Sequence, residues 1–451
     1  MEKYDVVVVG AGTAGCMTAK TVAEAGLSVC LVERKERESI GEKICGDALG
    51  EHHFRELDLE KPQGKELEMR IEGIKIISPN EETVYTIADS DYVGYMLNRR
   101  LFGQWLLKKA LDAGATLMDS TRFLEPTFKD GSVNGIVAKN SDATIQLESK
   151  VVVDASGYMG VVRHKLPVEM GIEKEIDGGD VGIIYREIRQ LKQEIEDTKY
   201  CKIYLSHHVS PGGYAWIFPG TEARVNTGLG VCMAKGFPNP RKRFREHMLK
   251  RPIFEGSEMI SGGAWFDPTR RPIDKMVGNG VMLTGDAAWL VNPLHGGGIG
   301  PSMLSGFYAG QTIVNALEKG DASESALWPY ASRFMVSYGG KQASIDIFRV
   351  LLQACSDTDL NYGMSCQLLT EEDILKAGLG DEFRLNITET ARRVFRGLAR
   401  MRFLNKLRLT ANIMRHVRAH YKTYPETPEG FEDWRLNTES IWSQAHLKLR
   451  E

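Results

Sequence analysis

VVVVGAGTAG, residues 6–15, says more about the architecture than any other segment, because it joins a run of β-branched residues to a regular pattern of glycines. Four consecutive valines are typical of a strand buried on both faces of a parallel sheet. Gly10, Gly12 and Gly15 have the spacing G-x-G-x-x-G, and a helical stretch and a second apolar run, residues 29–32, follow them. This order predicts a βαβ unit at the start of a parallel sheet.

The glycine pattern predicts a dinucleotide site. The first glycine permits a tight turn, the second lets the backbone approach a pyrophosphate, and the third lets the helix pack on the strand. The helix N-terminus then offers free N–H groups to the anion, so Gly10, Gly12, Ala14 and Gly15 are candidate contacts. Glu33 lies eighteen residues beyond Gly15, where a carboxylate can accept hydrogen bonds from an adenosine ribose.

Length and composition exclude several classes of protein. With 451 residues the chain has room for two or three domains. Its 42% hydrophobic and 26% charged residues, with a mean hydropathy of -0.26, exclude a disordered chain and a multi-span membrane protein. A net charge of -3 gives no broad basic field, so we expect no nucleic-acid partner.

The seven cysteines and the N-terminus predict a cytoplasmic location. No pair of cysteines has the spacing C-x-x-C, which favours a reducing compartment and indicates no structural zinc; we expect no metal. The N-terminus lacks the pattern of a signal peptide. Residues 287–317 are long and apolar enough for a membrane span, but Asn292, Pro293 and the glycines at 296–298 predict a buried loop and helix instead.

Two changes of pattern divide the remaining chain. Between residues 171 and 235 short spaced strands predict an antiparallel sheet inserted into the nucleotide domain. After about residue 303 helical patterns dominate to the end. The expected strands are at 115–118, 133–138, 151–153, 181–185, 202–206, 215–218, 225–231 and 281–284, and a helix is expected at 101–113.

Several later segments resemble flavin enzymes that have the p-hydroxybenzoate-hydroxylase type of FAD domain. In those enzymes the glycine loop is joined by an arginine that starts a helix, here in NRRLF (98–102), and by a strand that ends like VDASG (153–157). A Gly-Asp segment follows, here LTGDAA (283–288), with PLHGGGIG (293–300) after it. The resemblance implies that the cofactor is FAD rather than NAD.

The resemblance and the strand pattern together predict the fold class. We expect an α/β chain with a Rossmann-like FAD-binding domain, an inserted antiparallel-sheet substrate domain and a C-terminal helical region. The FAD-binding domain is expected at 1–60, 92–165 and 270–320, the substrate domain at 61–91 and 166–269, and the helical region at 321–451.

The resemblance also implies which residues bind FAD. The cofactor needs donors for its phosphates, carboxylates at its polyols and a glycine-lined slot for its ring. Arg99 would bind the phosphates and Asp286 the ribityl chain; the alternatives are an exposed helix arginine and an ordinary turn aspartate. Phe123 would meet the adenine through its backbone or pack in the core. The full implied set is Gly10, Gly12, Ala14, Gly15, Glu33, Arg34, Cys45, Gly46, Ala48, Arg99, Phe123, Asp286, Gly297, Gly298 and Ile299.

Two further motifs are similar to those of geranylgeranyl reductases. YAWIFP (214–219), with GLG (228–230) downstream, is similar to their Y-x-W-x-F-P and G-x-G signature, and KICGD (43–47) is similar to their cysteine loop. The similarity is greatest to the archaeal branch, the digeranylgeranylglycerophospholipid reductases. It implies an FAD-dependent oxidoreductase of lipid biosynthesis that saturates C=C bonds of geranylgeranyl chains on ether-lipid precursors.

The aromatic motif has a physical rationale of its own. Alternate residues of a strand share a face, so Tyr214, Trp216 and Phe218 would form one apolar wall. Burial of a hydrocarbon chain against it contributes about 0.8 kcal/mol per methylene. The alternative is a plain aromatic core strand. The substrate site is expected to comprise Tyr214, Trp216, Phe218, Pro219, Gly228, Gly230 and His295.

Cys45 is the candidate catalytic residue. In the expected reaction, reduced FAD transfers a hydride to one alkene carbon while a proton reaches the other, and a neutral thiol can donate that proton. The alternative is a loop thiol that only packs. The donor of the proton, the chain length and the number of bonds reduced are open at this point.

Two other functions and the electron donor stay open. A flavin monooxygenase or halogenase of the same fold, acting on an aromatic substrate, is the closest alternative, although the first tryptophan of the halogenase motif W-x-W-x-I-P is absent. A lipid carrier with an unused cofactor site is the non-enzymatic one. Since no second G-x-G-x-x-G follows a strand, electrons would come from a ferredoxin-like protein or from NAD(P)H binding transiently.

Residues 384–422 form a basic, amphipathic segment. They contain eleven lysines and arginines and one acid, Glu389, with apolar residues at helical spacing. Such a segment can rest on an anionic membrane, which would place the protein peripherally on the inner membrane face. The alternative is a helix that packs on its own domain.

Overall fold

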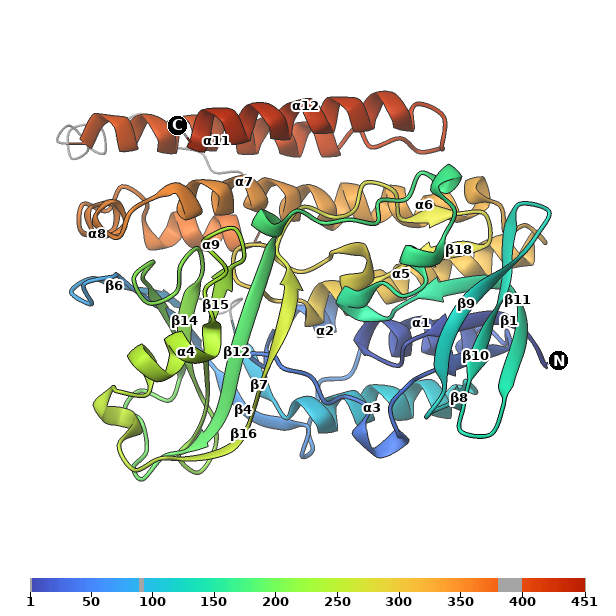
Figure 1. Ribbon diagram of the computed structural model, residues 1–451, viewed down its shortest axis with the longest axis horizontal. Coiled ribbons are helices and arrows are strands. Elements are labelled where there is room, and N and C mark those ends of the chain that lie inside the picture. Colours follow the sequence, from blue (N-terminus) through green and yellow to red (C-terminus); the bar gives the residue numbers. More distant parts are fainter. Residues whose placement is uncertain (1, 89–92, 380–399, 451) are drawn as a thin grey trace.

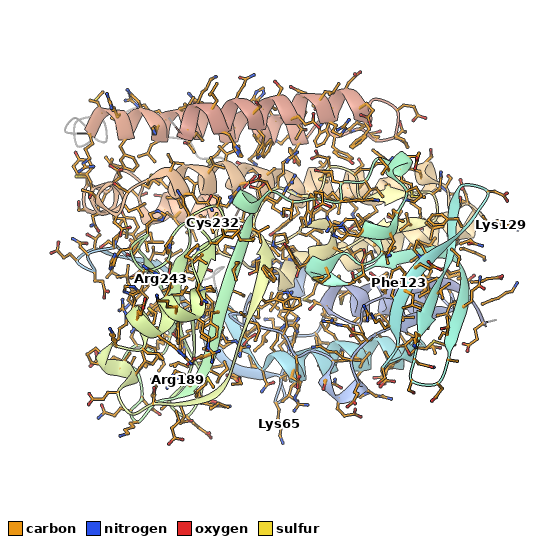
Figure 2. All side chains as sticks on the ribbon, in the orientation of Figure 1. Lys65, Phe123, Lys129, Arg189, Cys232 and Arg243 are labelled. Carbon is orange, nitrogen blue, oxygen red and sulfur yellow. The ribbon has the colours of Figure 1, made fainter. Side chains whose placement is uncertain are left out.

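The computed structural model describes residues 2–88, 93–379 and 400–450 (Figure 1). Two sheets lie side by side beneath a layer of helices, and the last two helices, α11 and α12, form an outer layer above α7. The arrangement confirms the expected fold class. Side chains fill the space between these layers (Figure 2).

The first sheet has eight strands and is built on the N-terminal valines. β1 lies between β2 and β11 and runs parallel to both, and Val6 to Val9 are all buried, as the β-branched run predicts. The order is β17-β18-β11-β1-β2-β8, with β10 and β9 continuing from β11. The bounds are β1 Glu2–Val9, β2 Val29–Val32, β8 Thr116–Met118, β9 Arg122–Lys129, β10 Ser132–Lys139, β11 Thr144–Asp154, β17 Val277–Gly278 and β18 Val281–Leu283.

The second sheet has seven strands in the order β16-β12-β15-β14-β13-β5-β6. It is not wholly antiparallel as predicted, because β5 runs parallel to β13. The edge strand β16 is also absent from the prediction, because its glycines and mixed polarity leave no regular alternation of apolar and polar residues. The bounds are β5 Gly73–Ile77, β6 Val84–Ala88, β12 Val181–Gln190, β13 Tyr200–Leu205, β14 Tyr214–Pro219, β15 Arg224–Cys232 and β16 Glu258–Pro268.

A small third sheet joins the two larger ones. β7 (Gly94–Leu97) pairs with β3 (Ala48–Gly50) on one side and with β4 (Leu67–Ile71) on the other. Met96 on β7 packs against Trp216 of the seven-stranded sheet. The expected domain boundaries remain a proposal, and this sheet draws strands from both sides of one of them.

The C-terminal part is helical, as predicted. Among the described residues, no helix is both long and apolar enough to cross a membrane. Part of the basic segment, residues 384–399, lies outside the described residues. The bounds are α1 Thr13–Glu24, α2 His52–Glu56, α3 Arg99–Asp112, α4 Pro240–Arg243, α5 Ile299–Glu318, α6 Glu324–Phe334, α7 Gly340–Ala354, α8 Asp357–Ser365, α9 Glu371–Leu379, α11 Met401–Tyr421 and α12 Phe431–Arg450.

Helix α11 packs against α7 along its apolar side. Leu404 and Val417 of α11 are buried, and a Cβ on Gly340, where α7 begins, would lie 2.9 Å from the Cβ of Tyr421, where α11 ends. Arg402 and Arg415 of the same helix are exposed. Part of the described half of the basic segment therefore packs inside the protein, while Met401 of the same segment is exposed, and membrane contact stays a prediction.

Candidate functional site

The glycine loop after β1 forms a tight cradle. Gly10 has φ +107°, and a Cβ there would lie 2.4 Å from the carbonyl oxygen of Ala155. A Cβ on Gly15 would lie 1.9 Å from the Gly10 oxygen, whereas a Cβ on Gly12 would meet no described atom within 4 Å. Gly10 and Gly15 thus serve close packing, and Gly12 leaves open space where an anion can approach the backbone.

Glu33 closes one side of this cradle. It follows β2, and its carboxylate accepts hydrogen bonds from the backbone N–H groups of Ala11 (2.9 Å) and Lys35 (3.0 Å). These bonds hold the carboxylate at the rim of the glycine loop, where the ribose of a dinucleotide is expected. The next residue, Arg34, is exposed.

Arg99 begins α3 and reaches the first turn of α1. Its Nη2 donates to Thr13 Oγ1 at 2.9 Å, while its Nε and Nη1 are buried and have no hydrogen-bond partner among the described residues. Buried donors of a charged group are seldom left unpaired, because each costs about 1–3 kcal/mol or more. The guanidinium therefore fits a phosphate, and it is not the exposed helix arginine of the alternative.

Asp286 lies just beyond β18 and is 4% exposed. Its Oδ2 accepts a hydrogen bond from Lys43 Nζ at 2.5 Å, and its Oδ1 is buried without a partner among the described residues. A Cβ on Gly298 would lie 3.2 Å from this Oδ1. With the donors of Arg99 and the space at Gly12, an unpaired acceptor here matches the polar groups of FAD, so the residues fit this cofactor.

The loop before α5 carries the expected ring contacts. The N–H of Gly297 donates to His295 Nδ1 at 3.1 Å, and the carbonyl of Gly297 accepts from the Asn292 N–H at 3.1 Å. Gly298 caps α5, which begins at Ile299. Contact between these residues and the flavin ring stays a prediction. Of the backbone N–H groups of Gly297, Gly298 and Ile299, that of Gly297 is hydrogen-bonded to His295 in this structure.

Phe123 lies near the start of β9, at the opposite end of the strand from Lys129 (Figure 2). Its side chain is buried in the core of the eight-stranded sheet. The side chain therefore packs, and only the backbone of Phe123 is left for the expected contact with adenine. Ala14 is likewise buried in this core.

The cysteine loop, residues 41–47, is held against the seven-stranded sheet. Arg186 Nε on β12 and Asn226 Nδ2 on β15 both donate to the carbonyl oxygen of Cys45, at 3.1 and 2.9 Å. Asn226 also donates to Asp47 Oδ2 at 2.8 Å. Cys45 is half-buried, and burial raises the pKa of its thiol to about 11, so the thiol stays protonated at neutral pH.

The aromatic residues of β14 form the wall that the alternation predicts. Trp216 lies between Tyr214 and Phe218, with ring centroids 6.1 Å from each. Ala215 and Ile217 pack in a separate core on the other side of the sheet. The alternation is confirmed, while contact with a substrate stays a prediction.

Small residues let the loop and the neighbouring strand approach this wall. A Cβ on Gly46 would lie 3.0 Å from Phe218 Cε2, so the cysteine loop lies on the wall. A Cβ on Gly228 would lie 2.5 Å from Trp216 Cζ2, and one on Gly230 would lie 3.3 Å from Ile184. Gly228 is therefore required by the indole. Pro219 ends the strand, and Ala48 begins β3 directly after the loop.

Three functional candidates were missing from the sequence prediction. Arg186, Asn226 and Asp267 point to the loops from strands of the second sheet, and pairing of distant strands cannot be read from spacing. Asp47 was part of the quoted motif KICGD, but it was not among the candidate site residues. Its φ of 63° and its bond to Asn226 show that it shapes the loop.

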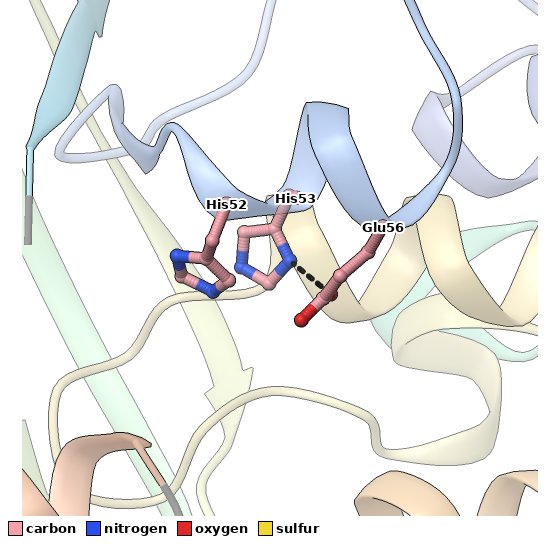
Figure 3. Close-up of side chains that lie close together, drawn as sticks. All are labelled: His52, His53 and Glu56. Carbon is pink, nitrogen blue, oxygen red and sulfur yellow. Dashed lines mark ion pairs between the residues drawn. The ribbon is translucent and has the colours of Figure 1, made fainter. Parts of the chain in front are cut away.

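His52, His53 and Glu56 form the only group of three potential metal ligands within the described ranges (Figure 3). Their ligand atoms lie within 4.8 Å of one another, and His53 Nδ1 is 3.5 Å from Glu56 Oε2. Burial, followed by the charges of His53 and Lys341, lowers the pKa of His52 to about 4. The positive charge of Lys341 opposes a bound cation, so the group is a weak candidate for a metal site.

Comparison with known sequences gives consistent matches. A family model described as an FAD binding domain matches residues 3–335. The digeranylgeranylglycerophospholipid reductase of Sulfolobus acidocaldarius is 39% identical over 450 residues, which cover 99% of this chain and 99% of that protein. The reductase of the same name from Methanothrix thermoacetophila is 34% identical over 390 residues, 85% of this chain and 96% of that protein.

Solved structures share the fold at lower identity. A geranylgeranyl bacteriochlorophyll reductase-like protein from Thermoplasma acidophilum aligns with a TM-score of 0.77 at 22% identity, over 91% of this chain and all of that one. A flavin-dependent brominase aligns with a TM-score of 0.64 at 19% identity, over 98% of this chain and 100% of that chain. At these identities the likeness shows the fold alone.

Proposed function

The chain belongs to the family of FAD-dependent digeranylgeranylglycerophospholipid reductases, and from this membership we propose that it saturates the C=C bonds of geranylgeranyl chains on an ether phospholipid. One observation carries the proposal beyond family membership. The cysteine loop lies across the aromatic wall of β14, and Lys43 of the same loop reaches Asp286 in the FAD cradle. An apolar surface and the cofactor site therefore meet at one loop.

The residues of the chain supply binding and the exclusion of water. Arg99, Asp286 and the backbone at Gly12 would hold FAD, which supplies a hydride when it is bound in its reduced form. Trp216 and Phe218 present ring faces to a hydrocarbon chain. An isolated alkene accepts a hydride poorly, so positive charge develops at carbon as a proton arrives, and ring faces in a dry pocket stabilise that charge.

The decisive experiment follows the flavin without oxygen. The purified protein is loaded with FAD, photoreduced anaerobically and mixed with digeranylgeranylglycerophospholipid. We expect the oxidised flavin spectrum to return, with a mass gain of two hydrogens for each bond reduced. The fully saturated lipid is the control, because it offers no alkene.

A monooxygenase or halogenase is the second outcome of this experiment. Reduced flavin that is stable with the unsaturated lipid, but reacts with oxygen and modifies an aromatic compound, would contradict the reductase proposal. This alternative is relevant because the solved brominase has the same fold. That likeness in fold says nothing about the substrate of this chain.

Two classes of electron donor are compatible with the proposal. A ferredoxin-like protein and NAD(P)H can both reduce a flavin that has no dedicated nicotinamide domain. Anaerobic mixing of the oxidised protein with each donor separates them, since only the physiological class should bleach the flavin within the turnover time.

Peripheral membrane contact would bring the protein to its lipid. Arg402 and Arg415 of α11 are exposed, and their charges support contact with anionic headgroups. Sedimentation with anionic vesicles at low and high salt tests it. We expect binding at low salt that weakens in high salt, and weaker binding by the double variant Arg402→Gln, Arg415→Gln; equal binding by both proteins would contradict the contact.

A further inference from the structure

Asp267 lies on the same sheet face as the aromatic wall. On β12, Arg186 pairs with Gly228 of β15, which in turn pairs with Trp216, so these three positions share a face. Gly182 is four residues before Arg186 on β12, hence on that same face, and it pairs with Asp267 of β16. The carboxyl group therefore belongs to the surface that the cysteine loop covers.

The surroundings of Asp267 place it beside the loop that precedes α5. Its Oδ2 and the Tyr214 hydroxyl each lie 3.7 Å from the Cβ position of Gly296. Tyr214 itself donates to the carbonyl oxygen of His295 at 2.6 Å. Asp267 is 9% exposed, and within the described part of the chain its carboxylate accepts no hydrogen bond that the structure records.

Three charged or titratable groups face Asp267 from neighbouring elements. They are Lys43 of the cysteine loop, Asp286 after β18 and Tyr214 of β14. Burial is the main cause that raises the pKa of Asp267 to about 7; the charge of Asp286 adds to the rise and that of Lys43 opposes it. The carboxyl group thus carries a proton in a large fraction of molecules at neutral pH.

Other acids near the wall are less suited to give up a proton. Burial raises the pKa of the Cys45 thiol to about 11 and that of the Tyr214 hydroxyl well above its usual range. Asp47 is bound by Asn226 and lies 3.5 Å from Arg186. Among the described acids on this face, Asp267 is the one that has both a pKa near neutrality and no recorded hydrogen-bond partner.

We propose, on the basis of the proposed function, that Asp267 donates the proton for alkene reduction. The O–H bond of the carboxyl group breaks, and its proton forms a C–H bond at one alkene carbon. The hydride of the proposed reaction forms the second C–H bond, and the π bond is consumed. Asp267 is left as a carboxylate near Lys43 and regains its proton from water.

The test compares Asp267→Asn and Asp267→Glu with Glu258→Gln, a control at an exposed acid on the same strand. The rate is that of anaerobic flavin reoxidation by the unsaturated lipid. Asp267→Asn should be slower by about 100-fold or more, with FAD still bound, because general acid catalysis contributes about 10²–10⁴. Asp267→Glu should recover part of the rate, and Glu258→Gln should match the wild type.

The pH profile gives a readout that a structural role would not change. Since the protonated form is required, the wild-type rate should be level at low pH and fall about tenfold per unit above pH 7, and Asp267→Asn should lose this inflexion. In the protein without FAD, infrared titration should show a protonated carboxyl group up to about pH 7 that Asp267→Asn lacks.

Each outcome is decisive. A wild-type rate or an unchanged inflexion in Asp267→Asn overturns the proton-donor assignment and leaves the reductase function standing. A wild-type protein that the lipid never reoxidises refutes the proposed function itself. If Asp267→Asn fails to bind FAD, the infrared titration of the wild type decides, and absence of a carboxyl group titrating near pH 7 overturns the assignment.

Discussion

Arg99 and Asn226 show how single side chains connect parts of this chain that lie far apart in sequence. Arg99 bonds to Thr13, 86 residues earlier, and Asn226 bonds to Cys45, 181 residues earlier. The first pairing supports the cofactor cradle and the second supports the cysteine loop. Each pairing can be tested by replacement of one residue.

Replacement of Arg99 by Ala should weaken FAD binding. The buried guanidinium has two donors free for a phosphate, and a hydrogen bond of a charged group contributes about 1.5–3 kcal/mol, or roughly 10- to 100-fold in affinity. Fluorescence titration of the unloaded protein with FAD measures the effect. Arg100→Ala is the matched control, since Arg100 is the exposed neighbour on the same helix; equal losses in both variants would contradict the assignment.

Replacement of Asn226 by Ala should release the cysteine loop. The change removes donors to the Cys45 carbonyl and Asp47 and the acceptor of the Trp216 indole N–H, at a cost of about 1–3 kcal/mol. We expect faster alkylation of Cys45, measured by peptide mass spectrometry. Cys45→Ser in the same background identifies the signal, and an unchanged alkylation rate would show that the loop is held by other contacts.

At the scale of elements, strand β14 and its neighbour β15 act as one surface. The period of two was enough to predict that Tyr214, Trp216 and Phe218 share a face, since alternation is a property of any extended strand. The glycine opposite Trp216 was predicted only through resemblance. The structure gives its reason, because the indole occupies the space of a side chain at Gly228.

A valine at Gly228 should therefore destabilise the protein. Its Cβ alone would lie 2.5 Å from Trp216 Cζ2 and 2.4 Å from the Tyr185 carbonyl oxygen, so the indole or the strand must move, at a cost of about 1–3 kcal/mol. Urea unfolding measures the change. Gly230→Ala is the milder comparison, with 3.3 Å to Ile184, and a Gly228→Val protein as stable as Gly230→Ala would refute this packing argument.

At the scale of the whole molecule, the cysteine loop couples the two larger sheets. Lys43 reaches Asp286 beside the eight-stranded sheet, while Arg186 of the seven-stranded sheet donates to the Lys43 carbonyl oxygen at 3.1 Å. Both contacts converge where FAD would bind. Occupation of the cofactor site should therefore stabilise both sheets together.

We expect FAD to raise the free energy of unfolding by mass action. At a free concentration of 100 times Kd the gain is about 2.7 kcal/mol. Urea unfolding is followed by the fluorescence of the seven tryptophans, of which Trp216 and Trp265 lie in the second sheet. The Arg99→Ala variant should gain less at the same concentration, and an unfolding curve that does not respond to FAD would contradict the coupling.

What the sequence alone determined is local. The glycine cradle, the buried valine strand and the aromatic alternation depend on backbone conformation and on neighbours a few residues away, so residue type and spacing are sufficient to predict them. The FAD assignment needed the family resemblance, because a glycine loop binds more than one dinucleotide.

Only the tertiary structure decided which groups meet on the covered face of the second sheet. Arg186, Asn226 and Asp267 are ordinary polar residues in sequence, and Asp267 lies on a strand with no clear period. Their roles arise from strand pairings and from the cysteine loop, which is more than a hundred residues away from each of them. The free energy of those pairings depends on the burial of the whole sheet rather than on any local pattern.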